Sequence, residues 1–403
     1  MRSMGAIVFL PREGEEPSLL LRPILFDPAA VWLSAALERA GVERFLVVCR
    51  EEDRAAAGAS FPQGTEFVTE GAEDAASRLL AFLDDLEDRV CVFTRPVFLD
   101  DQGAGYLTGR FGDALPKGED AGVYALPPKT LREAAAGGAD FLTAVRALGR
   151  SFGVREGHYQ GLLPLDGCAP TWDSAQSFAR YASIARLTEA LSTRPVRFID
   201  KERAYIGPRV RVGEGTVILP GVILRGETAI GRDCEIGPDA MIRDCVIGDR
   251  VTVNASQLNE STVDDGAKVG PFAYVRPNCR VGKDVKVGDF VELKNSTVGD
   301  GTKISHLTYV GDTDAGSHIN FGCGTVTVNY DGSAKYRTVI GDGAFIGCNT
   351  NLVAPVKIGE GAYTAAGSTV TEDVPADSLC IARSPQTIKV QWAAKRRRAK
   401  GRK

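Results

Sequence analysis

From Ile206 onward the hydrophobic positions of this chain follow a period of six residues. An aliphatic residue followed by glycine recurs at gaps that are mostly 6, 12 or 18 residues. An α-helix repeats near 3.6 residues and an extended strand near 2, so neither produces this spacing. Short parallel strands wound into a solenoid do, with one inward aliphatic residue on each side and glycine at the corners. The aliphatic members of the pairs are Ile206, Val212, Ile230, Ile236, Ile247, Val269, Val281, Val287, Val298, Val310, Ile340, Ile346 and Ile358.

The repeat predicts roughly nine coils of about eighteen residues each, ending near Asp373. It is interrupted once, between Val326 and Val339, where no aliphatic–glycine pair occurs. We expect a loop to leave the solenoid there, and excursions from a rigid scaffold often carry function. The segment Pro375–Trp392 follows the last coil and is expected to cap it, because the ends of solenoids need covering.

Before residue 193 the pattern is different and predicts alternating strands and helices. This alternation is typical of a parallel α/β sheet. The predicted strands are 4–10, 45–48 and 90–93, and the predicted helices are 28–40, 75–85 and 172–191. We therefore predict an α/β domain over 1–192, a linker over 193–204, the repeat over 205–374, and a cap with a basic tail over 375–403.

The composition is that of an ordinary globular protein, with 44% hydrophobic and 25% charged residues. A chain of 403 residues is too long for one compact core, which agrees with two domains. No stretch approaches the ~20 apolar residues that span a bilayer, and the N-terminal apolar run is too short for a signal peptide. Nine cysteines include no C-x-x-C pair, so we expect small buried residues in a reducing cytoplasm and no metal site.

The charge is uneven along the chain. The net charge is −4, yet the last nine residues, KRRRAKGRK, hold seven basic side chains. Without them the chain has 41 Lys and Arg instead of 48, against 52 Asp and Glu. A basic tail on an acidic body is compatible with nucleic-acid binding. The absence of interleaved aromatic residues favours a solvated, disordered tail instead.

Three histidines are present, and one of them lies among other polar residues of the repeat. His306 stands in KISHLTY, after Lys294 and before Tyr309, and Asn320, Asn329, Tyr330 and Lys335 follow. A neutral imidazole suits the removal of a proton from a nucleophile, and nearby cations suit an anionic substrate such as a sugar phosphate. Alone, His306 would more often be structural, which is how we interpret His158 and His318.

The residues from Gly270 to Gln386 resemble the acetyltransferase domain of one bacterial family. The matching sequence segments are GPFAYVRP, GDFVELKNS, HLTYVGD, INFGCGTVTVNYDG, YRTVIGD, LVAP, AAGSTVT and ARSPQ. The family is the bifunctional glucosamine-1-phosphate acetyltransferase / N-acetylglucosamine-1-phosphate uridyltransferase. The resemblance implies a left-handed parallel β-helix that forms homotrimers, with active sites between neighbouring subunits. Handedness comes only from the family, since ordinary parallel crossovers are right-handed.

The same resemblance assigns roles to individual residues. His306 matches the general base, and the sugar phosphate is matched by Arg276, Lys294, Tyr309, Asn320 and Lys335. The acetyl-CoA side is matched by Cys323, Asn329, Tyr330, Cys348, Ala366 and Arg383. The main-chain N–H of Cys323 matches the group that faces the thioester oxygen. Relatives carry alanine or serine at the two cysteine positions, and direct transfer needs no acyl-enzyme, so a nucleophilic thiol is the weaker alternative.

The N-terminal half departs from the family. A glycine-rich phosphate loop is expected after the first strand, but the chain has LPREGEEP, with Glu13, Glu15 and Glu16 where phosphate would lie. The G-T-G-H-A segment has no counterpart beyond Gly71–Ser77. Thr94 and Arg95 stand where the family holds magnesium through aspartate, and Asp173 alone does not make a metal site. We expect a diverged nucleotidyltransferase-like domain, Rossmann-like in fold, without uridyltransferase activity or Mg²⁺.

Two hypotheses of different kinds follow. The first is a cytoplasmic acyltransferase that acetylates glucosamine 1-phosphate with acetyl-CoA for UDP-N-acetylglucosamine and cell-wall synthesis, with retained uridylyl transfer as the alternative. The second is a trimeric scaffold without catalysis. The set of His306, Arg276, Lys294 and Lys335 argues against a scaffold, which would need none of them.

Overall fold

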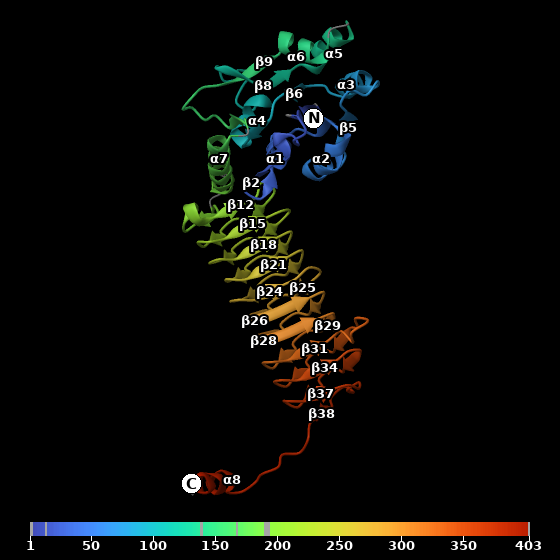
Figure 1. Ribbon diagram of the computed structural model, residues 1–403, viewed down its shortest axis with the longest axis vertical. Coiled ribbons are helices and arrows are strands. Elements are labelled where there is room, and N and C mark those ends of the chain that lie inside the picture. Colours follow the sequence, from blue (N-terminus) through green and yellow to red (C-terminus); the bar gives the residue numbers. More distant parts are fainter. Residues whose placement is uncertain (1–2, 13, 138–139, 167, 189–193, 402–403) are drawn as a thin grey trace. The chain divides into compact units, whose positions relative to one another are not determined.

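The computed structural model describes residues 3–12, 14–137, 140–166, 168–188 and 194–401. The chain divides into two compact units, Met1–Asp249 and Arg250–Lys403. Figure 1 shows the helices and strands of both units. The division falls inside the repeat, so each unit contains coils of the solenoid. The domain boundaries expected from the sequence stay predictions. The C-terminal part of the helix predicted over 172–191, from residue 189, and the first residue of the predicted linker lie outside the described residues.

The first unit contains a six-stranded α/β sheet. Its four parallel strands stand in the order β5-β4-β1-β6, and β8 and β9 extend it with antiparallel pairing. A parallel sheet with its first strand inside is the arrangement of doubly wound folds, and the predicted α/β class is confirmed. The strands are β1 (Met4–Phe9), β4 (Arg44–Cys49), β5 (Glu66–Thr69), β6 (Arg89–Phe93), β8 (Glu119–Leu126) and β9 (Arg150–Val154).

Helices cover both faces of this sheet because its central strands are apolar on both sides. Ala6 and Val8 of β1 belong to one buried cluster, which includes residues of α1, α2, α4 and α7. Ile7 belongs to a second cluster, with residues of α3, α5 and α6. The helices are α1 (Ala29–Arg39), α2 (Arg54–Ser60), α3 (Ala75–Asp84), α4 (Asp101–Leu107), α5 (Pro128–Ala136), α6 (Phe141–Leu148) and α7 (Ala169–Thr188).

Short elements complete the α/β part. Two antiparallel pairs, β2 with β3 and β7 with β10, lie outside the main sheet. Their bounds, with those of the 3-10 turns, are β2 (Pro23–Ile24), β3 (Asp27–Pro28), β7 (Val97–Leu99), β10 (Leu162–Pro164), η1 (Leu19–Leu21), η2 (Glu51–Asp53) and η3 (Lys201–Arg203).

The first unit ends in coils of parallel two- and three-residue strands. Val217 pairs with Glu235, and Ile223 with Met241, each eighteen residues later. The strand β11 lies inside the predicted linker and pairs with β14, so coil-like pairing begins before Tyr205. These strands are β11 (Arg197–Phe198), β12 (Tyr205–Ile206), β13 (Arg211–Val212), β14 (Val217–Ile218), β15 (Ile223–Arg225), β16 (Ala229–Ile230), β17 (Glu235–Ile236), β18 (Met241–Arg243) and β19 (Val246–Ile247).

The second unit continues with coils whose parallel pairs are again about one coil apart, such as Phe345 with Tyr363. The predicted left-handed parallel β-helix of hexapeptide repeats is confirmed. Its strands are β20 (Thr252–Val253), β21 (Gln257–Asn259), β22 (Thr262–Val263), β23 (Lys268–Val269), β24 (Tyr274–Val275), β25 (Arg280–Val281), β26 (Lys286–Lys294), β27 (Thr297–Val298), β28 (Lys303–Gly311), β29 (Thr313–Ala315), β30 (Asn320–Phe321), β31 (Val326–Val328), β32 (Thr338–Ile340), β33 (Phe345–Ile346), β34 (Asn351–Val353), β35 (Val356–Ile358), β36 (Tyr363–Thr364), β37 (Thr369–Val370) and β38 (Leu379–Cys380).

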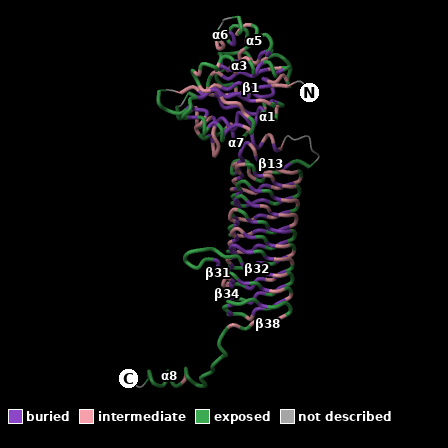
Figure 2. Tube along the Cα trace, turned by 90° about the vertical axis from the view of Figure 1, so that its right-hand side faces the viewer, coloured by how far each residue is buried: buried purple, intermediate pink, exposed green. Residues whose placement is uncertain are grey.

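The aliphatic–glycine pairs explain the interior of the coils. Every aliphatic member except Val212 is buried, and Figure 2 shows buried positions recurring along each coil. Most of the paired glycines have an ordinary φ and are needed for another reason. A Cβ on Gly288, for example, would collide with the main-chain oxygen of Ser305 on the next coil. Left-handed corners fall largely on other residues, including Asn295 and Asp312.

The C-terminal segment differs in part from the expected cap. The strand β38 pairs with β36 and so belongs to the last coil. Residues 384–391 are exposed and contain no helix or strand. The basic tail forms the exposed helix α8 (Trp392–Lys400), where we expected disorder, because Ala, Lys and Arg favour helix and Arg396 stacks on Trp392 at 5.2 Å. None of the described helices is long and apolar enough to cross a membrane.

Candidate functional site

All the site residues predicted from the sequence lie in the second unit, and His306 has a specific partner there. His306 in β28 pairs with Asp289 in β26, one coil earlier. The His306 Nδ1 atom lies 2.6 Å from Asp289 Oδ1. The hydrogen bond to His306 lowers the pKa of Asp289 below its ordinary value, so this partner is a carboxylate at neutral pH.

This pair defines the orientation of the imidazole. A carboxylate accepts only from an N–H, so the neutral ring carries its proton on Nδ1 and leaves the lone pair on Nε2. The His306 side chain is 57% exposed, which leaves it open to solvent and to a substrate. An imidazole oriented in this way can act as a general base.

Beyond the corner that follows His306, charged residues gather on the next side of the coil. Arg276 donates to Glu292 at 2.9 Å, and this hydrogen bond raises the pKa of Arg276. The register places Arg276 beside Lys294 and Glu292 beside Tyr309 on neighbouring coils. Two cations side by side form a surface suited to a phosphate.

Asp312 links Lys294 to the loop between β31 and β32, which we call the excursion. Lys294 Nζ donates to its Oδ2 at 3.0 Å, and the side-chain amides of Asn295 and Asn329 also donate to it. Burial alone would raise the pKa of Asp312, but these hydrogen bonds hold the pKa below its ordinary value. Asn329 is therefore buried and committed to a structural contact at the start of the excursion.

Three other predicted residues stand in line with His306. The pairs Ile304 with Phe321, Phe321 with Ile346, and Ile346 with Thr364 set the register. Two residues further on, this register aligns His306 with Cys323, Cys348 and Ala366. All four are exposed, and successive coils are about 4.8 Å apart, so they form a column along the solenoid.

The main chain of Cys323 has a free donor. Its carbonyl oxygen accepts from Asn349 N at 2.8 Å, but no described residue accepts from its N–H. An unpaired N–H one coil from His306 can stabilise an oxyanion. The thiols of Cys168, Cys323 and Cys348 are exposed, which corrects the expectation that the cysteines are buried. Two of the three occupy outward positions of this column.

Other predicted residues are not brought to His306 within one chain. Lys335 and Tyr330 form a bridge in the excursion and are exposed, and Tyr330 Oη donates to Gly332 O at 2.7 Å. Arg383 is exposed near Gly367 in the last coil. Asn320 begins β30, three residues before Cys323.

The sequence did not point to three carboxylates that contact the predicted site residues. They are Asp289, Glu292 and Asp312. Asp289 lies seventeen residues before His306, which is one coil in this region. Asp312 lies eighteen residues after Lys294. The coil period itself would have found both, because residues one period apart are neighbours in a solenoid.

The carboxyl edge of the N-terminal sheet is poorly suited to a nucleotide phosphate. In the loop after β1, Arg12 is bound by Asp53 at 2.9 Å, and Arg22 lies 3.4 Å from Glu16. Glu13 lies outside the described residues. The cavity here holds about 490 Å³ and is bordered by Thr94 and Arg95.

Thr94 and Arg95, the residues at the expected magnesium position, do not suit that ion. A hydroxyl and a guanidinium stand where oxygen anions are needed. No group of three or more His, Cys, Asp or Glu residues suited to a metal occurs among the described residues, Asp173 included.

Comparison with known proteins identifies relatives for about half of the chain. Residues 337–372 match the family model described as bacterial transferase hexapeptide (six repeats). "Bifunctional protein GlmU" of Clostridium kluyveri is 52% identical over 201 residues, or 50% of this chain and 44% of that protein. The protein of the same name from Brevibacillus brevis is 50% identical over 208 residues, 52% of this chain and 45% of its own length. The chain thus spans less than half the length of the curated relatives it matches.

Solved structures also match. A UDP-N-acetylglucosamine acyltransferase of Francisella novicida gives a TM-score of 0.29 at 17% identity, covering 48% of this chain and 72% of that chain. LpxA from Acinetobacter baumannii gives 0.22 at 17% identity, covering 49% and 76%. Scores this low add nothing to what the sequence relatives provide.

Proposed function

We propose that this chain is an acyltransferase that moves an acetyl group from acetyl-CoA to the amine of glucosamine 1-phosphate. The observation that carries the proposal is the 2.6 Å contact between Asp289 and His306 on an open face of the coils. Identity near 50% to proteins named GlmU over about 200 residues supports it. A non-catalytic solenoid would not need an oriented imidazole.

In this mechanism the amine nitrogen attacks the thioester carbonyl carbon while His306 Nε2 takes a proton from that nitrogen. The carbon–sulfur bond then breaks, and the proton passes to the departing thiolate of coenzyme A. The negative charge that develops on the carbonyl oxygen is met by the free N–H of Cys323. One such donor is typically worth ~3 kcal/mol of the activation barrier.

The sugar phosphate binds over the charged side of the coils. Arg276 and Lys294 would share the phosphate oxygens, which means that the substrate competes with Glu292 and Asp312 for these cations. Tyr309, on the coil next to Glu292, would contact the sugar. Asn320 and Lys335 would supply further sugar contacts from a neighbouring copy.

Acetyl-CoA would bind along the column that runs from His306 toward Ala366. Cys323, Cys348 and Ala366 offer small side chains and main-chain groups to an extended thiol arm. Tyr330 and Arg383, both exposed, would contact the nucleotide end of the cofactor. Asn329 would act through Asp312, by fixing the base of the excursion.

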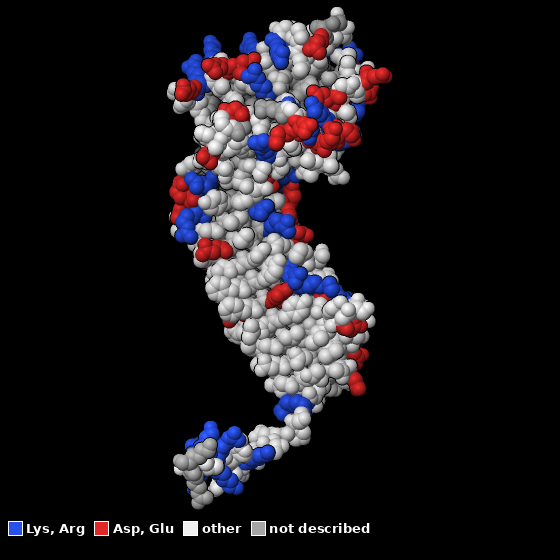
Figure 3. Space-filling view, viewed as in Figure 1, with Lys and Arg blue, Asp and Glu red and all other residues white. Residues whose placement is uncertain are grey.

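We propose a homotrimer because one chain does not bring Lys335 to His306, so a neighbouring copy would have to supply Lys335. Large apolar side chains stay exposed at the corner beside His306: Phe272 is 60% and Phe290 59% exposed, and their rings stack at 5.5 Å. Leu307 continues this ridge. Figure 3 shows a broad uncharged surface over the second unit. Such a surface is suited to a second copy of the chain.

The N-terminal domain, on this proposal, no longer transfers uridylyl groups, so another enzyme must convert the product to UDP-N-acetylglucosamine for the cell wall. We place the reaction in the cytoplasm, where thiols stay reduced, in keeping with the nine free cysteines.

The test is an assay of both half-reactions on the full chain, with and without magnesium. We expect release of coenzyme A that depends on glucosamine 1-phosphate, and no pyrophosphate from UTP. If coenzyme A is not released with any amino-sugar phosphate, the scaffold hypothesis holds instead.

A further inference from the structure

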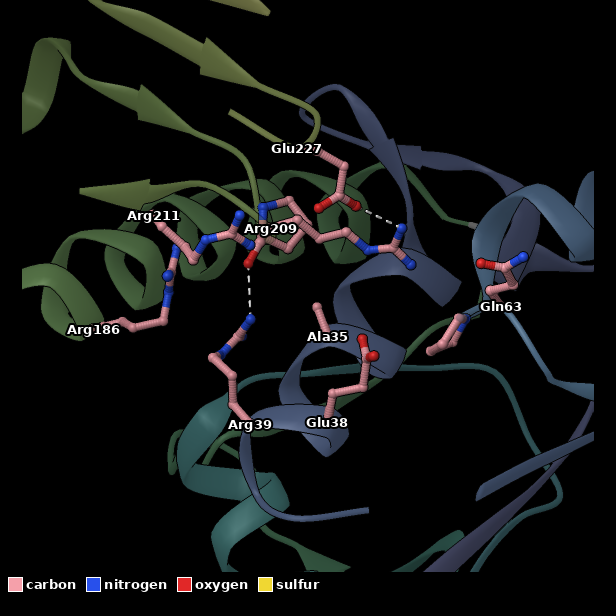
Figure 4. Close-up of a pocket in the computed structure, with 10 residues that line it drawn as sticks. Ala35, Glu38, Arg39, Gln63, Arg186, Arg209, Arg211 and Glu227 are labelled. Carbon is pink, nitrogen blue, oxygen red and sulfur yellow. Dashed lines mark hydrogen bonds and ion pairs between the residues drawn. The ribbon is translucent and has the colours of Figure 1, made fainter. Parts of the chain in front are cut away.

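A cavity of about 350 Å³ lies in the first unit, far along the chain from the transferase residues. It is bounded by the end of α1, the connection from α2 to β5, helix α7 and the beginning of the coils (Figure 4). Charged side chains dominate its wall. They are Glu38, Arg39, Arg186, Arg209, Arg211 and Glu227.

Two of the four arginines are neutralised. Arg39 forms an ion pair with Asp101 at 2.6 Å and donates to Pro208 O at 2.8 Å. Arg209 forms an ion pair with Glu227 at 3.0 Å. The Nε atom of Arg209 is nevertheless buried and has no hydrogen-bond partner among the described residues.

The other two arginines form no ion pair with a carboxylate in the described part of the chain. Arg186 donates to the main-chain oxygens of Val210 at 2.9 Å and Gly207 at 3.5 Å. Desolvation, followed by the nearby charge of Arg39, lowers the pKa of Arg186 to about 10. In the described part of the chain, the Arg211 guanidinium makes no hydrogen bond or ion pair. Arg186 and Arg211 are therefore the two wall cations that form no ion pair among the described residues.

Glu38 is the remaining acid. Desolvation raises the pKa of Glu38 above its ordinary value, and the nearby charges of Arg209 and Arg39 oppose this effect. A carboxyl group in this position can accept a hydrogen bond from a hydroxyl group. Paired guanidinium forks match the oxygens of a phosphate, and a space of about 350 Å³ is at the small end of ligand sites.

We propose that this cavity binds a small organic phosphate of about the size of a sugar monophosphate. Arg186 and Arg211 would hold the phosphate group, and Glu38 a hydroxyl group. Because the wall combines helices of the α/β part with the first coils, the ligand would stabilise the first unit as a whole.

The test uses calorimetry and thermal unfolding of the full chain with glucose 6-phosphate, glucose and inorganic phosphate. We expect glucose 6-phosphate to bind and raise the melting temperature, with glucose inactive and inorganic phosphate weaker. The variant R211A should weaken binding about tenfold or more, the effect of losing one charge-assisted hydrogen bond. R146A removes an exposed arginine of α6 and is the matched control.

Repeating the titration with R276A distinguishes binding in this cavity from binding at the transferase face. Binding that persists in R276A and is lost in R211A supports the cavity. Binding lost in R276A but kept in R211A, no binding at all, or inorganic phosphate binding as well as glucose 6-phosphate would overturn the proposal. R186Q is a second variant, and R211A decides the matter if R186Q does not fold.

Discussion

Asp289 and His306 lie opposite each other on neighbouring coils, and the carboxylate oxygen stands 2.6 Å from Nδ1 of the imidazole. The two residues are seventeen positions apart in the chain, yet the parallel register makes them direct neighbours. One side chain thereby orients the other without help from a loop. Because both residues lie in strands of the coils, the orientation of the His306 imidazole is fixed by the coils themselves.

Replacement of His306 by alanine should lower acetyl transfer by about two to four orders of magnitude, the usual contribution of a positioned base. The fold should survive because the side chain is exposed and contributes little to packing. Steady-state kinetics with a melting curve give both answers. H158A, which removes an exposed histidine of the first unit, is the control. Near-full turnover in H306A at neutral pH would exclude His306 as the base.

The variant D289N keeps the shape of Asp289 but removes its charge. We expect kcat to fall about ten- to a hundredfold, the effect of one charge-assisted hydrogen bond, while KM for both substrates changes little. A merely structural role would instead lower the melting temperature. D264N, which disrupts a surface pair with Arg280, should leave kcat unchanged. Equal losses in the two variants would argue against a positioning role.

Arg276 and Lys335 should act mainly on substrate affinity. R276A and K335A should each raise KM for glucosamine 1-phosphate about ten- to a hundredfold. Mixed assemblies of the two variants test whether neighbours share a site, since some trimer interfaces would then hold both intact residues. Hybrids verified by mass that regain no activity would contradict shared sites.

The buried carboxylate of Asp312 predicts a pH dependence of stability. Its folded-state pKa lies below the ordinary carboxyl value of about 4, so its stabilising effect is complete above that value. The effect is lost as the pH falls through the lower folded-state pKa. D312N should therefore unfold more easily by about 2–4 kcal/mol at pH 7, because Lys294 loses its partner. The difference from wild type should shrink in acid, and denaturant titrations at several pH values measure it.

The N-terminal domain should form no detectable UDP-N-acetylglucosamine from UTP and N-acetylglucosamine 1-phosphate. The loop after β1 presents acids, and its cations Arg12 and Arg22 are already paired. Like charges near a triphosphate cost of order 1 kcal/mol each, even in contact with solvent. Calorimetry with UTP and magnesium is the direct measurement. Tight binding together with product would show that the loop after β1 does the work of a glycine-rich phosphate loop.

The sequence predicted the repeat well because one aliphatic residue per side must be buried in every coil. Ile304 and Val310, for example, are fully buried on either side of His306. The α/β part was predicted through its apolar strands, with β1, β4 and β6 near their expected positions. The helical tail was missed because charge suggested disorder, although local propensity favoured helix.

The site was only partly predictable. Motifs pointed to His306, but its partner Asp289 depends on the register between coils, which a linear motif does not contain. The cations of the cavity in the first unit were missed for the same reason. Arg186 and Arg211 come from a helix and a coil that only the folded chain brings together.

The excursion between β31 and β32 has a consequence for how such a protein can change. Val326 pairs with Asn351, twenty-five residues later, whereas Phe345 pairs with Tyr363 after only eighteen. The extra residues leave at a corner and return without disturbing the stacking on either side. Asn329 and Arg337 anchor the two ends to Asp312 and Asp314 of the preceding coil. The solenoid thus tolerates inserted segments at its corners. New specificity can evolve by such insertions, while the stacked coils continue to provide the stability of the fold.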